Sequence, residues 1–276
     1  MKHKYGRSII KYLFLIIMSV WVLFPILWML STSLKTTVET LGGAPHWIPE
    51  KITLEAYKNL FVLYPFKNYF ISSLIVTLST TAIAVVFSLL ASYGVTRYRF
   101  TGRNFFLTYL LVTQMFPSIM LLIPAYKILN SYGLADTYTG VILLLTSFTV
   151  PFCSWLMKGY METIPLELDE SALIDGCPRW KALFCIICPL ALPGMAATAI
   201  YAFIQTWNEY MFTYILINTE YKKTLPVGIG QLNGFYRTEW NEMMAACFIS
   251  AFPVILVFIF FQKYFIASLT SGAVKE

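Results

Sequence analysis

The residues from Asn68 to Thr96, NYFISSLIVTLSTTAIAVVFSLLASYGVT, form an unbroken run without a charged side chain. An α-helix rises about 1.5 Å per residue, so about 20 apolar residues cross a hydrocarbon core of about 30 Å. This run is longer than that length requires. Backbone groups in lipid must be hydrogen-bonded within the segment or within a closed barrel, and the alternation typical of barrel strands is missing here. The run therefore predicts a membrane-spanning helix.

Five further runs of this kind occur along the chain. They are Tyr12–Leu34, Asn104–Tyr126, Thr137–Met157, Ala182–Asn208 and Met243–Gln262. The chain of 276 residues is 58% hydrophobic and 12% charged, whereas about a quarter of the residues in an ordinary soluble domain are charged. A soluble domain of this size could not bury so much apolar surface. The sequence predicts an all-α integral membrane protein with six transmembrane helices.

Basic residues flank the apolar runs and set the expected orientation. Arg97, Arg99 and Arg103 crowd one short connection, and an excess of Lys and Arg marks the cytoplasmic side. Both termini are then expected in the cytoplasm. The expected organisation is a cytoplasmic N-terminus at 1–11, a six-helix transmembrane domain at 12–266 and a cytoplasmic tail at 267–276. Within the transmembrane domain we expect a cytoplasmic connection at 162–189 and extracytoplasmic loops at 35–67 and 209–242.

An acidic cluster stands out in the cytoplasmic connection. It contains Glu162, Glu167, Asp169, Glu170 and Asp175. Pro165 suits the first turn of a helix, carboxylates stabilise the N-terminal end, and Gly176 suits a left-handed C-cap. The pattern predicts a short helix over 165–175. It could be a solvated connector, as charge runs commonly are, or a knob that docks on a cytoplasmic partner. The capped helix favours the knob.

Several function classes find no support in the sequence. It contains no G-x-x-x-x-G-K-[ST] nucleotide-binding motif and no basic stripe for nucleic acid. Cys185 and Cys188 match C-x-x-C, but no second pair completes a metal site. The six runs hold no charged residue and no histidine, which argues against an ion-coupled secondary transporter and an intramembrane enzyme. A membrane scaffold is a further alternative, although it would not need the capped acidic helix.

The spacing around the acidic helix carries a family resemblance. Glu170-Ser-Ala-Leu-Ile-Asp-Gly176, nine residues, and Ile186-Ile-Cys-Pro189 resemble the EAA loop of ATP-binding-cassette (ABC) importer permeases. That loop runs E-A-A, three residues, G, nine residues, I-x-L-P; Ser171 and Cys188 depart from it. Further stretches resemble the smaller, maltose-permease-like subunit of the carbohydrate-uptake branch: Tyr93–Arg103, Thr206–Tyr210 and the tail Leu269–Lys275, in which Ala273 replaces a usual glycine.

The resemblance implies a type I ABC importer permease fold and a set of partners. A second homologous permease would pair with this chain, two copies of an ABC ATPase would bind beneath, and an extracytoplasmic binding protein would deliver sugar from above. ATP and Mg would belong to the ATPase, so this chain would need no cofactor and would be no enzyme. Glu170 would engage the ATPase. The full set of implied coupling residues is Glu170, Ser171, Ala172, Asp175, Gly176 and Pro189.

The implied substrate is a sugar, and aromatic residues in the last outer loop favour an oligosaccharide. Glycerol phosphate and uronide oligosaccharides are alternatives within the same branch. A sugar pathway needs amide, hydroxyl and aromatic groups at membrane depth, for which the candidates are Gln114, Gln205, Asn208, Glu209 and Tyr210. The same side chains could instead bond helix to helix or anchor the chain at the interface.

The loop after the fifth run resembles the segment that reaches into the binding protein. The residues expected to make that contact are Gln231, Asn233, Gly234, Phe235 and Tyr236. The alternative is a passive loop. Its length in an otherwise compact chain favours a functional role.

Overall fold

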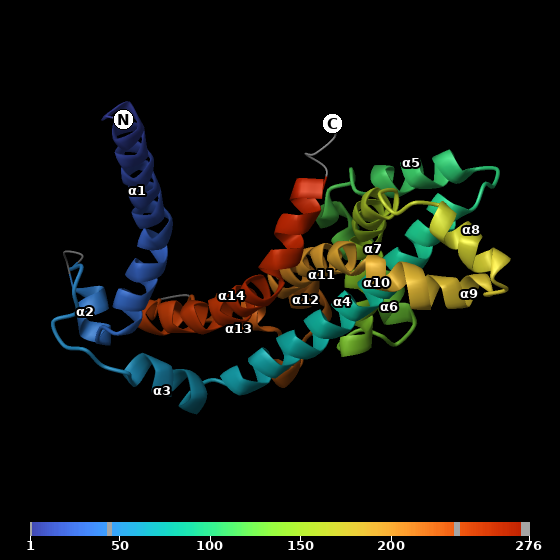
Figure 1. Cartoon of the computed structure of the whole chain (residues 1–276). Helices are drawn as coiled ribbons and strands as arrows, with labels where there is room; N and C mark the ends of the chain where they lie inside the picture. Colours follow the sequence, from blue (N-terminus) through green and yellow to red (C-terminus); the bar gives the residue numbers. More distant parts are fainter. Residues whose placement is uncertain (1, 43–45, 235–237, 272–276) are drawn as a thin grey trace. The chain divides into compact units, whose positions relative to one another are not determined.

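A computed structural model describes residues 2–42, 46–234 and 238–271 (Figure 1). The chain divides into two compact units. Unit 1 comprises Met1–Lys67 and Gly228–Phe252, and unit 2 comprises Asn68–Val227 and Pro253–Glu276. Within the described residues the regular structure is helical apart from an isolated β-bridge between Asn233 and Thr238. The expected all-α class is confirmed.

Unit 1 contains the first helices of the chain and part of the last one. α1 spans Lys2–Ser33, α2 spans Thr37–Leu41 and α3 spans Glu55–Val62, while α14 (Trp240–Ser271) contributes residues to both units. Polar side chains join these pieces. The Asn59 amide donates to Glu242 at 2.9 Å, and the Asn241 amide donates to Thr37 at 3.1 Å. Glu242 is buried, so the bond from Asn59 offsets part of the cost of removing its carboxylate from water.

Unit 2 is built around α4 (Phe66–Arg97), α7 (Tyr138–Met161) and α11 (Leu192–Trp207). α7 and α11 pack against each other, and Gly194 permits their close approach, because a Cβ built there would lie 2.6 Å from the Tyr160 ring. One end of α4 and α7 meets the segment before α11 in a cluster of buried apolar side chains: Leu89, Tyr93, Met157, Met161, Ile164, Leu183, Ile187 and Ala191.

The third uncharged run does not form the single helix that the sequence predicted. α5 (Arg103–Thr113) ends early, and a 3-10 turn (η1, Ser118–Leu121) leads into α6 (Leu122–Ser131). Pro117 explains the break, because its nitrogen carries no hydrogen for the helical ladder and its ring disfavours helical geometry in the preceding residue. The expectation of one continuous helix over Asn104–Tyr126 was wrong.

The fifth uncharged run is helical but sharply bent. α9 (Arg179–Ala182), a π-helical turn (η2, Leu183–Ile187) and α10 (Cys188–Leu190) precede α11, and the two arms meet at 77°. Pro189 and Pro193 lie on either side of the bend. Each removes a backbone donor and crowds the carbonyl four residues earlier, so the ladder cannot continue straight. Pro193 then falls in the first turn of α11, where a missing N–H costs nothing.

The described part of the chain contains four helices that are long and apolar enough to cross a membrane. They are Lys11–Ser33, Phe66–Arg97, Tyr138–Met161 and Trp240–Lys263, and the bent pair Arg179–Leu190 with Leu192–Trp207 makes a fifth if it is one span. The most apolar window of Lys11–Ser33 has none of its residues buried within the chain. Such a surface requires lipid or another protein around it.

Three short elements complete unit 2 and lead into unit 1: α12 (Met211–Leu216), η3 (Glu220–Lys222) and α13 (Leu225–Gln231). Asp136, in the turn before α7, ties this segment down. Its carboxylate accepts from the N–H groups of Asn218 at 3.0 Å and Thr219 at 2.9 Å, and from Lys222 at 3.4 Å. Burial would raise the pKa of Asp136, but hydrogen bonds from Thr219, Asn218 and Lys222 outweigh it and lower the pKa to about 2.

Candidate functional site

The acidic connection folds into a short helix, α8, which spans Glu167–Ile174. The expectation of a helix over 165–175 is confirmed apart from its first turn, since the helix begins two residues after Pro165. Glu167, Asp169 and Glu170 all fall in the first turn. Their carboxylates lie where the helix dipole is positive, which stabilises a helix too short to persist alone.

Gly176 ends α8 in the left-handed conformation that the sequence suggested. Its φ is +76°, its N–H donates to the Leu173 carbonyl at 3.1 Å, and the Cys177 N–H donates to the Ala172 carbonyl at 2.9 Å. These two bonds form a Schellman motif, which satisfies carbonyls that the helix would otherwise leave without donors. A Cβ built on Gly176 would meet no atom of this chain within 4 Å. Glycine is therefore required here by the backbone angle rather than by crowding within the chain.

Asp169 turns into the protein instead of facing solvent. Its Oδ2 lies 2.8 Å from Arg97 Nε, and its Oδ1 accepts from the Tyr93 hydroxyl at 2.9 Å. Arg97 also donates to the Ile164 carbonyl at 3.0 Å. The sequence placed Asp169 in the acidic cluster but did not predict this inward contact. The sequence carried one signal for this contact: Asp169 and the small apolar Ala172 lie three residues apart and so share a helix face. The structure buries both residues.

The outward face of α8 carries most of the expected coupling residues. Glu170, Ser171, Asp175 and Gly176 are exposed, whereas Ala172 is buried at 5% exposure. Ile174 extends this face with an apolar side chain that is 86% exposed. Pro189 lies elsewhere, on α10 next to the bend, and is also exposed. α8 and α9 lie beside the C-terminal end of α4 within unit 2 (Figure 1).

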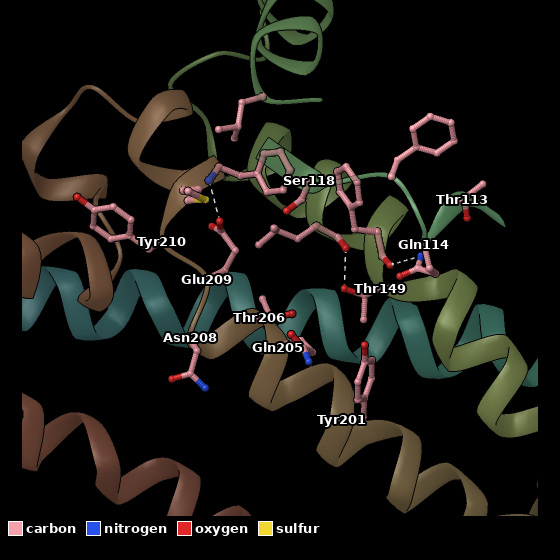
Figure 2. A pocket seen from close by; sticks show the side chains of 16 residues that line it. Thr113, Gln114, Ser118, Thr149, Tyr201, Gln205, Thr206, Asn208, Glu209 and Tyr210 are labelled. Carbon is pink, nitrogen blue, oxygen red and sulfur yellow. Dashed lines mark hydrogen bonds between the residues drawn. The ribbon is translucent and has the colours of Figure 1, made fainter. Parts of the chain in front are cut away.

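A second feature is a cavity of about 480 Å³, lined by both polar and apolar side chains, between α5, α7, α11 and the segment that follows α11. All five expected pathway residues line it: Gln114, Gln205, Asn208, Glu209 and Tyr210. Figure 2 shows Gln205 and Thr206 beside each other, with Thr149 and Tyr201 near them. Sequence reasoning missed Tyr201, Thr149 and Thr206 as lining residues. Tyr201 could have been predicted, because it lies four positions before Gln205 and therefore on the same face of the helix.

Three of the expected pathway residues already have partners within the chain. Gln114 donates to the Phe148 carbonyl at 3.1 Å, and Asn208 donates back to the Ile204 carbonyl at 2.8 Å. The Glu209 carboxylate caps α12: it accepts from the Phe212 N–H at 2.7 Å, the Thr213 N–H at 3.1 Å and the Thr213 hydroxyl at 2.8 Å. These bonds position backbone and helix ends.

The remaining lining groups have more capacity for a ligand. Among the described residues, neither the Gln205 amide nor the Tyr201 hydroxyl has a hydrogen-bond partner. The Tyr201 ring packs against Phe152, with ring centroids 4.3 Å apart, and Tyr210 stacks on Tyr214 at 5.4 Å. A cavity that combines amide and hydroxyl groups with aromatic faces matches the chemistry of a neutral polar ligand such as a sugar.

The expected binding-protein loop is described only in part. Gln231 ends α13, and Asn233 pairs with Thr238 through the β-bridge and a hydrogen bond of 2.6 Å from the Thr238 hydroxyl. Gly234, next to Asn233, is exposed. Phe235 and Tyr236 lie outside the described residues, and so does most of the tail Leu269–Lys275.

Comparisons with known proteins agree with the resemblance. The chain matches the family described as "Binding-protein-dependent transport system inner membrane component" over residues 84–271. It is 35% identical over 265 residues to the inner membrane ABC transporter permease protein YcjP of Escherichia coli (95% of this chain, 93% of the relative). It is 33% identical over 278 residues to the trehalose/maltose transport system permease protein MalG of Thermococcus litoralis (100% and 99%).

A solved structure shares the fold. In the crystal structure of a bacterial ABC transporter involved in the import of the acidic polysaccharide alginate, one chain superposes with a TM-score of 0.80 at 24% identity, covering 96% of this chain and 98% of that one. The family match, the relatives and the apolar helices agree. The chain belongs to the inner membrane components of binding-protein-dependent transport systems, the permeases of ABC importers, and is a multi-pass protein of the cytoplasmic membrane.

Proposed function

We propose that this chain is the smaller of two permease subunits in an ATP-driven importer of a sugar, with an oligosaccharide as the favoured substrate. Similarity over the whole length to a trehalose/maltose permease supports the sugar class. The cavity supports it independently, because its amide and hydroxyl groups and its aromatic rings suit a neutral, hydroxyl-rich ligand.

The proposal includes six membrane passes with both termini in the cytoplasm. The interrupted run α5–η1–α6 would count as one pass and the bent arm α9–α11 as another. Breaks inside a pass are tolerated where the irregular backbone is buried in protein or lines a cavity, and Gln114 and Ser118 at this break line the cavity. Arg97, Arg99 and Arg103 support a cytoplasmic position for the end of α4 and for the adjacent α8.

The observation that carries the proposed coupling is the two-sided character of α8. One side is fixed to α4 through Asp169, and the other side exposes Glu170 and Ser171 next to the apolar Ile174. A solvated connector would have no need of an inward anchor or of an isoleucine that is 86% exposed. We assign the exposed side to the ATPase, with Glu170 as the charged contact.

In this scheme the ATPase drives alternating access. Nucleotide binding closes the two ATPase copies, and their closure moves α8 together with the helices to which it is fixed. The permease pair then changes between inward- and outward-facing states whose relative stability depends on nucleotide and on the loaded binding protein. This chain supplies the moving helices and part of the pathway.

Charge reversal on α8 tests the docking assignment. In the complete importer in liposomes, Glu170→Lys should abolish stimulation of ATP hydrolysis by the loaded binding protein. Glu162→Lys is the matched control, because it makes the same change at an exposed position that precedes α8 and lies outside the proposed docking face. Full stimulation with Glu170→Lys, or equal loss with both variants, would remove Glu170 from the interface.

The loop after α13 is proposed to contact the binding protein. Deletion of Asn233–Tyr236 should prevent sugar release into the pathway while the membrane complex still assembles with its ATPase. Uptake assays with the loaded binding protein measure the first effect, and co-purification measures the second. Unchanged uptake would favour the passive loop.

A further inference from the structure

Asp169 and Arg97 form a buried ionic contact that joins α8 to α4. The Arg97 side chain is 4% exposed and the Asp169 side chain 12% exposed, with Nε and Oδ2 2.8 Å apart. The Tyr93 hydroxyl bonds to the second carboxylate oxygen at 2.9 Å. Because Tyr93 and Arg97 are four residues apart on α4, they lie on one face and hold Asp169 from two directions.

The same arginine also holds the segment that leads into α8. Its second contact, to the Ile164 carbonyl at 3.0 Å, fixes the backbone three residues before the helix begins. Arg97 therefore contacts both the backbone that precedes α8 and a side chain in the first turn of α8. Movement of the α8 N-terminus relative to α4 would break the contact with Asp169, the contact with Ile164 or both.

A second set of contacts, made through aromatic rings, joins the end of α4 to α9. Arg179, the first residue of α9, lies over the Tyr98 ring at 4.9 Å, and Tyr98 packs edge-on against Tyr93 with ring centroids 6.2 Å apart. The end of α4 is thus contacted by both arms of the α8–α9 connection. The contact from α8 is charged and buried, whereas the contact from α9 involves an exposed arginine.

Stability alone does not explain a buried ion pair in this place. Removing two charges from water is costly, and well-packed apolar residues commonly stabilise a fold as well or better. What the pair adds is a single permitted arrangement, since apolar surfaces can slide past each other, whereas the partners of a buried ion pair cannot separate without leaving a buried charge unpaired. A rigid arrangement is what a force-transmitting contact requires.

We propose that Arg97 and Asp169 are positioning residues that transmit the movement of α8 directly to α4. This inference rests on the proposed docking of the ATPase on α8. Neither residue would touch the ATPase or the sugar. Their effect would appear in the coupling between ATP hydrolysis and transport, and assembly would be preserved.

The test uses the complete importer in liposomes and measures the ratio of stimulated to basal ATP hydrolysis, sugar uptake and retention of the ATPase. Asp169→Asn should lower the stimulation ratio and uptake at least tenfold while the ATPase stays bound. Tyr93→Phe, which removes one hydrogen bond and no charge, should give a smaller loss. Glu162→Gln is the control, because it breaks a partly exposed ion pair with Lys158 at 2.9 Å close by and should leave coupling unchanged.

A second variant keeps the test decisive if a lone buried arginine prevents folding. The double change Arg97→Met with Asp169→Leu replaces the pair by apolar side chains of similar length and should restore assembly. An assembled but uncoupled double variant supports the proposal. Full coupling in it, or in assembled Asp169→Asn, overturns the proposal. If Glu170→Lys also leaves coupling intact, docking on α8 itself is wrong; if Glu170→Lys uncouples and these variants do not, only the link to α4 is wrong.

Discussion

Gly176 offers a sharp test of what the C-terminal end of α8 contributes to coupling. Its φ of +76° lies in the left-handed region, which costs an L-residue roughly 1–2 kcal/mol. No atom lies within 4 Å of a Cβ built there, so Gly176→Ala adds this conformational cost and no clash within the chain. A change of 1–2 kcal/mol shifts a local equilibrium about 5–30-fold. Since α8 has only eight residues, its cap should decide how often the helix end is formed.

Gly176→Ala should therefore lower stimulated ATP hydrolysis by up to about 5–30-fold in liposomes that contain the loaded binding protein. Gly176→Asn is the matched variant, because asparagine adopts the left-handed conformation more readily than alanine although it is larger. We expect its activity to fall between the wild type and Gly176→Ala. Retention of the ATPase and thermal stability of the permease should change little in either variant.

Two results would refute this reasoning. Wild-type stimulation in Gly176→Ala would mean that the backbone angle does not matter for coupling. A greater loss in Gly176→Asn than in Gly176→Ala would mean that side-chain volume decides, so that Gly176 serves close packing against the ATPase. The order of the two variants thus separates a conformational role from a contact role at one position.

Three further predictions follow from single contacts. Gly140→Ala would place a Cβ 2.2 Å from the Leu134 carbonyl oxygen and should destabilise the permease by roughly 1–3 kcal/mol. The control is Gly159→Ala, on the same helix in open space, which should be neutral or stabilising by up to about 1 kcal/mol. Melting temperatures in detergent measure both variants, and equal melting temperatures would contradict the close packing at Gly140. Asp136 has a pKa lowered to about 2 from 3.8, so its stabilising effect is present above about pH 4 and is lost as the pH falls toward 2. The melting temperature should then be higher for wild type than for Asp136→Asn at pH 5, and the gap should close on acidification; a constant gap would contradict the assignment. Gln205→Ala removes a cavity amide that has no hydrogen-bond partner among the described residues, and it should slow sugar uptake with the ATPase still bound. An unchanged uptake rate would mean that the cavity is not on the pathway.

The sequence by itself determined the membrane character and the presence of α8. Hydropathy is a local property, so four helices long and apolar enough to cross a membrane coincide with uncharged runs. Helix caps are local too, and Gly176 marked the end of α8 because only glycine adopts its backbone angle without cost. Spacing within the loop was sufficient to identify the family, which the comparisons confirmed.

The effect of each proline depended on its surroundings. Pro25, Pro151 and Pro253 lie inside continuous helices, whereas Pro117 accompanies the end of α5 and Pro193 a bend of 77°. All five residues carry the same steric restriction. Whether a helix tolerates it depends on which neighbouring groups satisfy the freed carbonyls and on what packs against the kink, and neither is encoded locally.

Tertiary structure alone decided the roles of neighbouring carboxylates. Asp169 and Glu170 are adjacent in the same helical turn and both carry a carboxylate, yet Asp169 contacts Arg97 and Tyr93 while Glu170 is exposed. Glu209, expected in the pathway, lines the cavity and also caps α12. The direction of a side chain on a helix relative to its neighbours follows from how whole helices pack, and that packing brings together residues that the sequence keeps far apart.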